Sequence, residues 1–166
     1  KKVQGLLGDA LVTSAINIPC SIEVADCVPV LLCSENGKEI AAIHAGWRGL
    51  LAGVIENTTE SLTTPPSKIK AWIGPAISQS VYSVGNDLRK SFCQRNPYYG
   101  NFFVELKNKI YFDLRGAVKY TLETSGISNV YQTSRCVYQE SESFFSFRRE
   151  KTADRMMGII WISDDP

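Results

Sequence analysis

The sequence predicts an α+β protein in which mixed β-sheets are flanked by helices. Two observations lead to this class. The length of 166 residues suits a single domain with a sizeable core. Short strand patterns occur in runs, and helical patterns are inserted between the runs. Hydrophobic residues make up 44% and charged residues 21% of the chain, as in an ordinary globular protein.

Strand patterns dominate the first half of the chain. Short runs rich in apolar and β-branched residues alternate with polar or glycine-containing turns. Asn36-Gly37 separates two of these runs, and this dipeptide is a strong signal for a hairpin. The strands are expected at residues 9–13, 20–24, 28–33, 39–44 and 69–73.

Three helices are expected. Residues 49–62 carry their apolar side chains on one side, which favours a single continuous helix. Residues 85–95 form the second helix, with Asn86 as its N-cap. The third helix begins at Asp113 and ends just before Gly126.

The C-terminal part contains two further strands and a polar, arginine-rich stretch between them. The strands are expected at residues 129–133 and 156–162. The intervening motif FFSFRRE alternates over residues 144–150, so that Ser146 and Arg148 share one face of an extended segment. An arginine there could pair with phosphate or carboxylate, or its charge could protect a sheet edge.

Charge and composition exclude several classes of partner. A net charge of +1 gives no basic field for nucleic acid, and no apolar run is long enough to span a membrane. The N-terminal residues do not resemble a signal peptide. The five cysteines are odd in number and not closely paired, which indicates reduced thiols and a cytoplasmic protein.

The chain contains one histidine, His44, seventeen positions after Cys27. A two-residue turn at Asn36-Gly37 would place Cys27 opposite Gly46, and a four-residue loop would place it opposite His44. Either register puts the thiol and the imidazole on the same face at the open end of the hairpin. There they could share a proton or a metal ion. The alternative is a buried apolar cysteine beside a hydrogen-bonded histidine.

Two large side chains follow the histidine in a stretch bounded by glycines. Trp47 could stack on a ligand ring or pack in the core. Arg48 stands at the expected start of a helix, where a bound anion would offset its unfavourable interaction with the helix dipole. A solvated surface charge is the alternative for Arg48.

Six motifs occur in an order that resembles the bacterial laccase-domain family. They are GDALVT, VADCVPVLL, AAIHAGWRGLLAGV, IGPAISQSVYSVG, SRCVYQ…SFFSFRRE and ADR, and they cover nearly the whole chain. This family is also called the polyphenol-oxidase or peptidoglycan-editing-factor family, and several members are described as purine nucleoside phosphorylases. The resemblance implies mixed sheets flanked by helices, similar to the catalytic domain of cytotoxic necrotizing factor.

The resemblance also implies a zinc site of two histidines and one cysteine. Cys27 matches the cysteine and His44 matches the second histidine. The first histidine of the family lies in an upstream Gln-x-His-Gly segment, so residues 1–166 are interpreted as a single domain that lacks the family's N-terminal segment. Candidates for a substitute ligand are Asp9, Asp26 and Cys20.

The function implied by the resemblance is a zinc-dependent purine nucleoside phosphorylase with adenosine deaminase activity, acting on a small-molecule nucleoside and phosphate. Zinc is favoured over copper, because a blue-copper centre needs two histidines and a cysteine. The expected catalytic residues are Cys27, His44 and Arg48, and the expected substrate-binding residues are Trp47, Arg148 and Ser146.

Two alternatives remain open. Cys27 could be the nucleophile of a metal-free hydrolase that acts on a cell-wall precursor, with His44 as its base. The chain could also be a truncated domain that is retained as a non-catalytic binding module.

Overall fold

The computed structural model describes residues 8–164, and its architecture is α+β, as the sequence predicts. The central sheet is mixed, because β5 and β9 are parallel and its other neighbours are antiparallel. In spatial order it contains β1 (Ala10–Thr13), β4 (Ile40–Ala45), β3 (Val28–Ser34), β5 (Ile69–Ile73) and β9 (Asn129–Gln132). The expectation that the N-terminal residues are not a signal peptide falls on residues 1–7, which lie outside the described residues.

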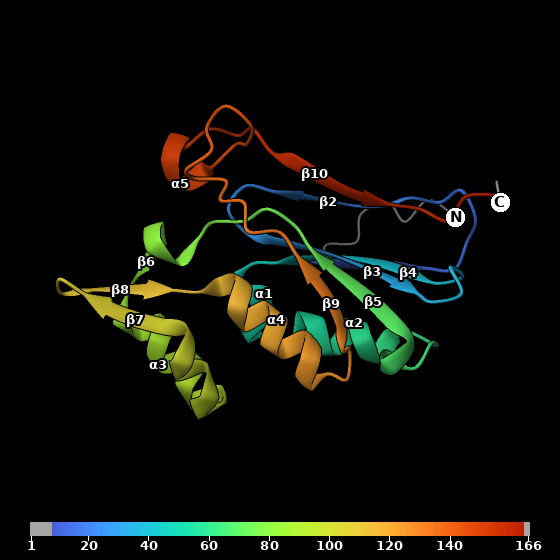
Figure 1. Cartoon of the computed structure of the whole chain (residues 1–166), viewed down its shortest axis with the longest axis horizontal. Coiled ribbons are helices and arrows are strands. Elements are labelled where there is room, and N and C mark those ends of the chain that lie inside the picture. The colour runs from blue at the N-terminus through green and yellow to red at the C-terminus, as the bar shows by residue number, and fades with distance from the viewer. Residues whose placement is uncertain (1–7, 165–166) are drawn as a thin grey trace.

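Two smaller sheets accompany the central one. A two-stranded ribbon pairs β2 (Cys20–Val24) antiparallel with β10 (Met156–Ile160). The other is a three-stranded antiparallel sheet of β6 (Ser83–Val84), β8 (Lys109–Phe112) and β7 (Phe103–Leu106). The ribbon lies over one face of the central sheet, and the three-stranded sheet lies at one end of the molecule (Figure 1).

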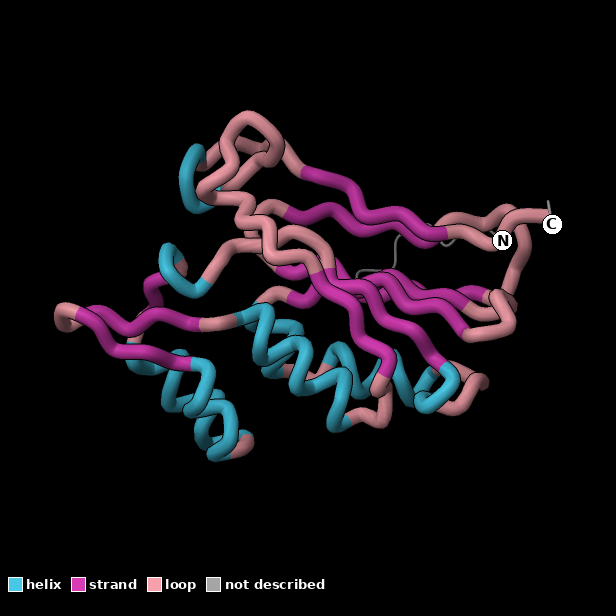
Figure 2. The backbone as a smooth tube through the Cα atoms, viewed as in Figure 1, coloured by secondary structure: helices cyan, strands magenta, loops and turns pink. Residues whose placement is uncertain are grey.

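Helices between β4 and β9 lie on the other side of the central sheet, whereas the short helix α5 (Phe147–Glu150) lies on the ribbon's side (Figure 1, Figure 2). The other α-helices are α1 (Trp47–Leu51), α2 (Val54–Ser61), α3 (Asn86–Arg95) and α4 (Leu114–Thr124). Short 3-10 turns are η1 (Pro66–Lys68), η2 (Gln79–Val81) and η3 (Pro97–Phe102). Helix α2 contacts β1 and β4, and α4 contacts β3, β5 and β9. The layers are therefore ribbon, sheet and helices.

Strands β3 and β4 of the central sheet are largely buried on both faces. Toward the helices, β3 contributes Val30 and Leu32, which are fully buried. Toward the ribbon, Ile40 and Ala42 of β4 pack against Ile22. A sheet covered on both sides needs nearly continuous apolar strands, which explains the uninterrupted run in β3. At the open end of the β3–β4 hairpin, polar side chains can reach solvent.

The single helix expected over residues 49–62 is wrong. Gly53 adopts a left-handed φ of 88° and separates α1 from α2. The Arg95 side chain donates to the carbonyl oxygens of Leu50, at 2.9 Å, and Leu51, so the end of α1 is capped from a distant helix. The apolar pattern continues across this break, because both helices face the same core.

The expected start and end of α4 are confirmed, whereas the expected N-cap of α3 is wrong. Asp113 caps α4 by accepting the Gly116 N–H at 2.9 Å, and Gly126 follows the helix at φ 90°, both as expected. Asn86 is not an N-cap but the first residue of α3, which Gly85 precedes in an extended conformation.

The extended segment expected over residues 144–150 is also wrong. Ser146 is the N-cap of α5, and its hydroxyl accepts the Arg149 N–H at 3.2 Å. The Glu150 carboxylate in turn accepts the Ser146 N–H at 3.3 Å. This reciprocal capping resembles a capping box, and it outweighs the alternation of aromatic and polar residues. Ser146 and Arg148 therefore do not share a strand face.

Two expectations from composition can be compared with the structure. All five cysteines are free thiols in the described part of the chain. No helix within residues 8–164 is long and apolar enough to cross a membrane.

Candidate active site

The open end of the β3–β4 hairpin brings Cys27 and His44 together. Pairing of Val28 with Ala45 and of Pro29 with His44 shows that the register places Cys27 opposite Gly46. A Cβ atom built on Gly46 would lie 3.0 Å from the Cys27 sulfur and 3.7 Å from His44 Nε2. The sulfur and the ring nitrogen therefore approach each other over a glycine that has no side chain to separate them. This confirms that the two side chains share one face.

Asp9 holds the imidazole from the other side. Its Oδ1 lies 3.0 Å from His44 Nδ1, and its backbone carbonyl accepts the His44 backbone N–H at 2.7 Å. Because Nδ1 engages the carboxylate, Nε2 is the nitrogen that faces the thiol. A hydrogen bond to the Cys27 side chain raises the pKa of His44 to about 9, against the effect of burial and with a further contribution from Asp9.

Cys27 and His44 supply two donors suited to zinc, a thiolate sulfur and an imidazole nitrogen. A carboxylate on the second ring nitrogen, as Asp9 provides, is the usual support for a metal-binding histidine. Catalytic zinc normally takes three protein ligands, however, and residues 8–164 contain no group of three or more candidate ligands placed to hold a metal. The residues present therefore fit two of the three ligand positions.

None of the three candidate substitutes joins the pair as a ligand. The Asp9 carboxylate is directed at Nδ1. The Asp26 oxygens accept hydrogen bonds from elsewhere in the chain, at 2.6 Å each. Cys20 is 3% exposed and lies in the apolar cluster between the ribbon and the central sheet. The sequence could not separate these roles, because they depend on side-chain direction.

Trp47 and Arg48 begin α1 beside the histidine. Trp47 is partly buried and packs against the main core, and the Arg48 guanidinium lies 4.2 Å from the centre of its ring. Helix α1 has only five residues, so its dipole gives little support to an anion. The group that can attract an anion here is therefore the exposed Arg48 guanidinium and not the helix dipole.

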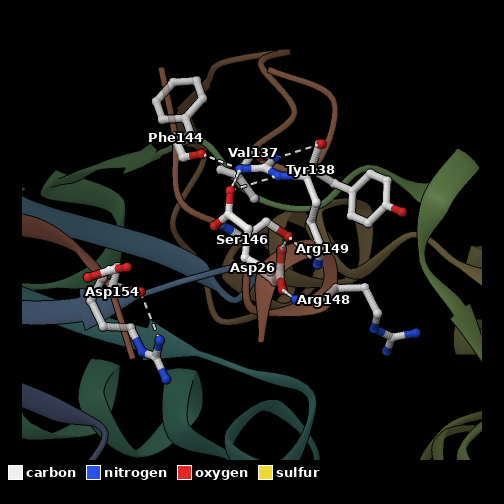
Figure 3. A network of polar contacts seen from close by, with 10 residues as sticks. Asp26, Val137, Tyr138, Phe144, Ser146, Arg148, Arg149 and Asp154 are labelled. Atoms are coloured by element: carbon white, nitrogen blue, oxygen red, sulfur yellow. Dashed lines mark hydrogen bonds and ion pairs between the residues drawn. The ribbon is translucent and has the colours of Figure 1, made fainter. Parts of the chain in front are cut away.

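Asp26, immediately before Cys27, connects the site to α5. Its carboxylate accepts the Ser146 hydroxyl and the Arg148 backbone N–H (Figure 3). Ser146 is 1% exposed, and its hydroxyl is engaged in holding Asp26. Arg149 is likewise structural, because its guanidinium donates to three backbone carbonyls, those of Val137, Tyr138 and Phe144.

The Arg148 side chain extends from this network toward Tyr82. Its guanidinium lies 5.1 Å from the centre of the Tyr82 ring and donates to the Ser83 carbonyl at 3.0 Å. Burial raises the pKa of Tyr82 to about 12, and the charges of Cys27, Arg148, Asp26 and Arg48 also act on its hydroxyl. Tyr82 therefore forms a wall of the site as well as part of the core. The sequence left open whether Tyr82 lines a pocket or belongs to the core.

A separate apolar cavity of about 400 Å³ lies between the ribbon and the central sheet. Its lining includes Pro29, Trp72 and Met157, and it contains neither Cys27 nor His44. Its apolar lining alone would direct attention to this cavity. The polar groups that can carry chemistry converge instead at the hairpin end, so the candidate site is placed there.

The chain resembles known proteins over nearly its whole length. Residues 2–163 match the family model described as multi-copper polyphenol oxidoreductase laccase. The Escherichia coli (strain K12) protein named purine nucleoside phosphorylase YfiH is 38% identical over 154 residues, covering 93% of this chain and 63% of that protein. The Pseudomonas aeruginosa protein named purine nucleoside phosphorylase PA4543 is 34% identical, covering 96% of this chain and 66% of that protein.

Solved structures give the same result for the fold. Neisseria meningitidis protein NMB0706 superposes with a TM-score of 0.90 at 37% identity, covering 93% of this chain and 64% of that chain. YlmD from Geobacillus stearothermophilus gives a TM-score of 0.87 at 30% identity, covering 94% and 61%. The chain therefore spans less than two thirds of the length of these relatives.

Proposed function

Because this chain belongs to the multi-copper polyphenol oxidoreductase laccase family, we propose that it carries the active site of a purine nucleoside phosphorylase. The proposal rests on one observation: Cys27, His44 and Asp9 meet at the open end of the hairpin. Two arginines, Arg48 and Arg148, flank this end. The names of the relatives supply the substrate class.

In phosphorolysis an oxygen of inorganic phosphate attacks C1′ of the ribose. A new C1′–O bond replaces the glycosidic C–N bond, and the purine leaves with the electron pair and takes up a proton. Arg48 and Arg148 hold the phosphate charge, for which guanidinium groups are well suited. The Trp47 ring offers a stacking surface to the purine.

Zinc is the proposed cofactor. Cys27 as thiolate and neutral His44, through Nε2, would hold the ion, and the third ligand would come from outside the described residues. Asp9 keeps the imidazole directed at the metal position. When bound, the ion supplies the Lewis-acid activation of water that adenosine deamination requires. We include this deamination as a second activity of the same site.

Metal analysis and product analysis test the proposal together. The purified chain is expected to contain zinc, to form ribose 1-phosphate from adenosine and phosphate, and to release inosine. Loss of both products in Cys27→Ser, with both retained in Cys93→Ser, would assign them to this site. Cys93 is a partly buried thiol on α3 and serves as the matched control.

A metal-free hydrolase acting on a cell-wall precursor is the second candidate. The order Asp9–His44–Cys27 also fits an orienting carboxylate, a base and a nucleophile. Full activity after chelation, together with covalent labelling of Cys27, would favour this candidate. Absence of zinc, turnover and labelling would leave a non-catalytic binding module.

Two broader expectations belong with this proposal. The resemblance of the sheets to the catalytic domain of cytotoxic necrotizing factor can be checked by superposition of the two backbones. A cytoplasmic site of action is consistent with the free thiols, and fractionation of cells that produce the protein would test it.

A further inference from the structure

Asp26 has a backbone conformation that is unusual for a buried residue. Its φ is 86°, in the left-handed region that favours glycine, and the residue is 9% exposed. The other non-glycine residues with positive φ in the described part of the chain are all exposed, and they are Asn17, Lys107, Asn108 and Lys151. A strained residue that persists in a buried turn must be held there by its surroundings.

The Asp26 carboxylate is held by two short hydrogen bonds from the region of α5. Oδ1 accepts the Ser146 hydroxyl at 2.6 Å, and Oδ2 accepts the Arg148 backbone N–H at 2.6 Å (Figure 3). The Asp26 carbonyl accepts the Ile77 N–H at 3.0 Å, so the turn is also tied to the loop after β5. Hydrogen bonds to a carboxylate are stronger than those between neutral groups, and these fix α5 relative to Cys27.

The fixed backbone determines where the Arg148 side chain starts. From there the guanidinium reaches the face of Tyr82 and the Ser83 carbonyl. Among the described residues this is its one hydrogen bond, and a guanidinium has five N–H donors, so donors remain for an oxyanion. The Asp26 carboxylate thus fixes both the turn that precedes Cys27 and the helix that carries Arg148.

We propose that Asp26 is a positioning residue that, with Ser146, holds Arg148 at the phosphate subsite beside Cys27. This inference rests on the proposed phosphorylase function and names a determinant of its phosphate affinity. Asp26 does not contact the substrate. It acts through the backbone of Arg148, so its removal should weaken phosphate binding more than nucleoside binding.

Asp26→Gly is the most informative variant. Glycine adopts φ 86° without strain, so the change removes the carboxylate and leaves the turn its conformation. We expect the KM for phosphate in adenosine phosphorolysis to rise about tenfold, the loss expected for a charge-assisted contact. The KM for adenosine should change by less than about twofold, a split that general loss of stability would not produce.

A double-mutant cycle tests the route through Arg148. In an Arg148→Ala background, Asp26→Gly should leave the phosphate KM unchanged within about twofold, because the group that it positions is gone. Asp26→Asn should retain most phosphate affinity, since its amide can accept the Arg148 N–H and donate to Ser146. If Asp26→Gly raises the phosphate KM by the same factor with and without Arg148, the inference is wrong.

Calorimetric titration with inorganic phosphate gives a second readout on the same proteins. A wild-type chain that neither binds phosphate nor forms ribose 1-phosphate overturns the proposed function, and this inference with it. A wild-type chain that binds phosphate, with unchanged affinity in Asp26→Gly, overturns this inference alone. Glu39→Gln is the control for loss of a buried carboxylate far from Cys27, and it should leave phosphate affinity unchanged.

Discussion

Asp26 and Cys27 are adjacent in the chain, yet they belong to regions that are built in different ways. Cys27 meets His44 across a single hairpin, and the contact follows from the pairing of two neighbouring strands. Asp26 meets Ser146 and Arg148 across 120 and 122 residues, and this contact requires that the whole domain has folded. The first region presents a sulfur and a ring nitrogen, and the second holds an arginine beside them.

The two regions therefore differ in role: the first carries the proposed reactive groups, and the second holds a side chain in position. The Cys27–His44 pair is partly open to solvent, with a His44 side chain that is 33% exposed, so changing it should cost little stability. The Asp26–Ser146 contact is buried, so breaking it should cost stability as well as function. Substitutions in the two regions should therefore produce different combinations of activity loss and unfolding.

The largest effect is expected at the hairpin end. Cys27→Ser should lower kcat/KM for adenosine phosphorolysis by about 100-fold or more, because it removes a proposed metal ligand. The free energy of unfolding should change by less than about 1 kcal/mol. Steady-state kinetics and urea unfolding measure the two quantities. Unfolding of the variant at 25 °C would show that the thiol is mainly structural.

Asp9→Asn should have the next largest effect. The amide keeps the size of the side chain but loses the charge that orients His44 at Nδ1, and loss of such support typically lowers metal affinity about tenfold. Zinc affinity can be measured by competition with a chromophoric chelator. Unchanged affinity would indicate that the backbone hydrogen bond between the two residues is sufficient to orient the ring.

Ser146→Ala tests the buried region by itself. The change removes the hydroxyl that donates to Asp26 and accepts from Arg149, so we expect a loss of about 1.5–3 kcal/mol in the free energy of unfolding. Ser91→Ala on α3, where the hydroxyl donates to a carbonyl of its own helix, should change stability by less than about 0.5 kcal/mol. Equal effects in the two variants would show that the Asp26 contact adds no stability.

The closed end of the same hairpin provides the smallest expected effect. Burial raises the pKa of Glu39, but hydrogen bonds from the backbone N–H groups of Thr63 and Thr64 outweigh it and leave the pKa below its usual value. The carboxylate therefore stabilises the fold above its unfolded pKa of about 4.3, and this stabilisation is lost as pH falls through the lower folded pKa.

Glu39→Gln should lower stability at pH 7 by about 1 kcal/mol and have less effect near pH 3. Thermal unfolding between pH 3 and 7 measures this difference. A destabilisation that is the same at every pH would contradict the assignment of the effect to the carboxylate charge. Activity should not follow this titration, because Glu39 lies at the far end of the hairpin from Cys27.

Local patterns predicted most strands and the ends of α4, but they failed where distant groups intervene. The helix expected over residues 49–62 is broken at Gly53, and Arg95 of α3 caps the first part. The extended segment expected over residues 144–150 is helical because Ser146 and Glu150 cap it reciprocally. The motif predicted Ser146 as a substrate-binding residue, but it gave no sign that the buried Ser146 hydroxyl donates to Asp26.

The sequence by itself determined that Cys27 and His44 face the same way. Strand side chains alternate with a period of two, and both hairpin registers expected at the Asn36-Gly37 turn keep that parity, whereas a register shifted by one residue would reverse it. Only the tertiary structure decided that Asp9 orients the ring and that Asp26 holds Arg148 against Tyr82. Those contacts join segments with no periodic relation, so their geometry arises from packing of the sheet, the helices and the ribbon.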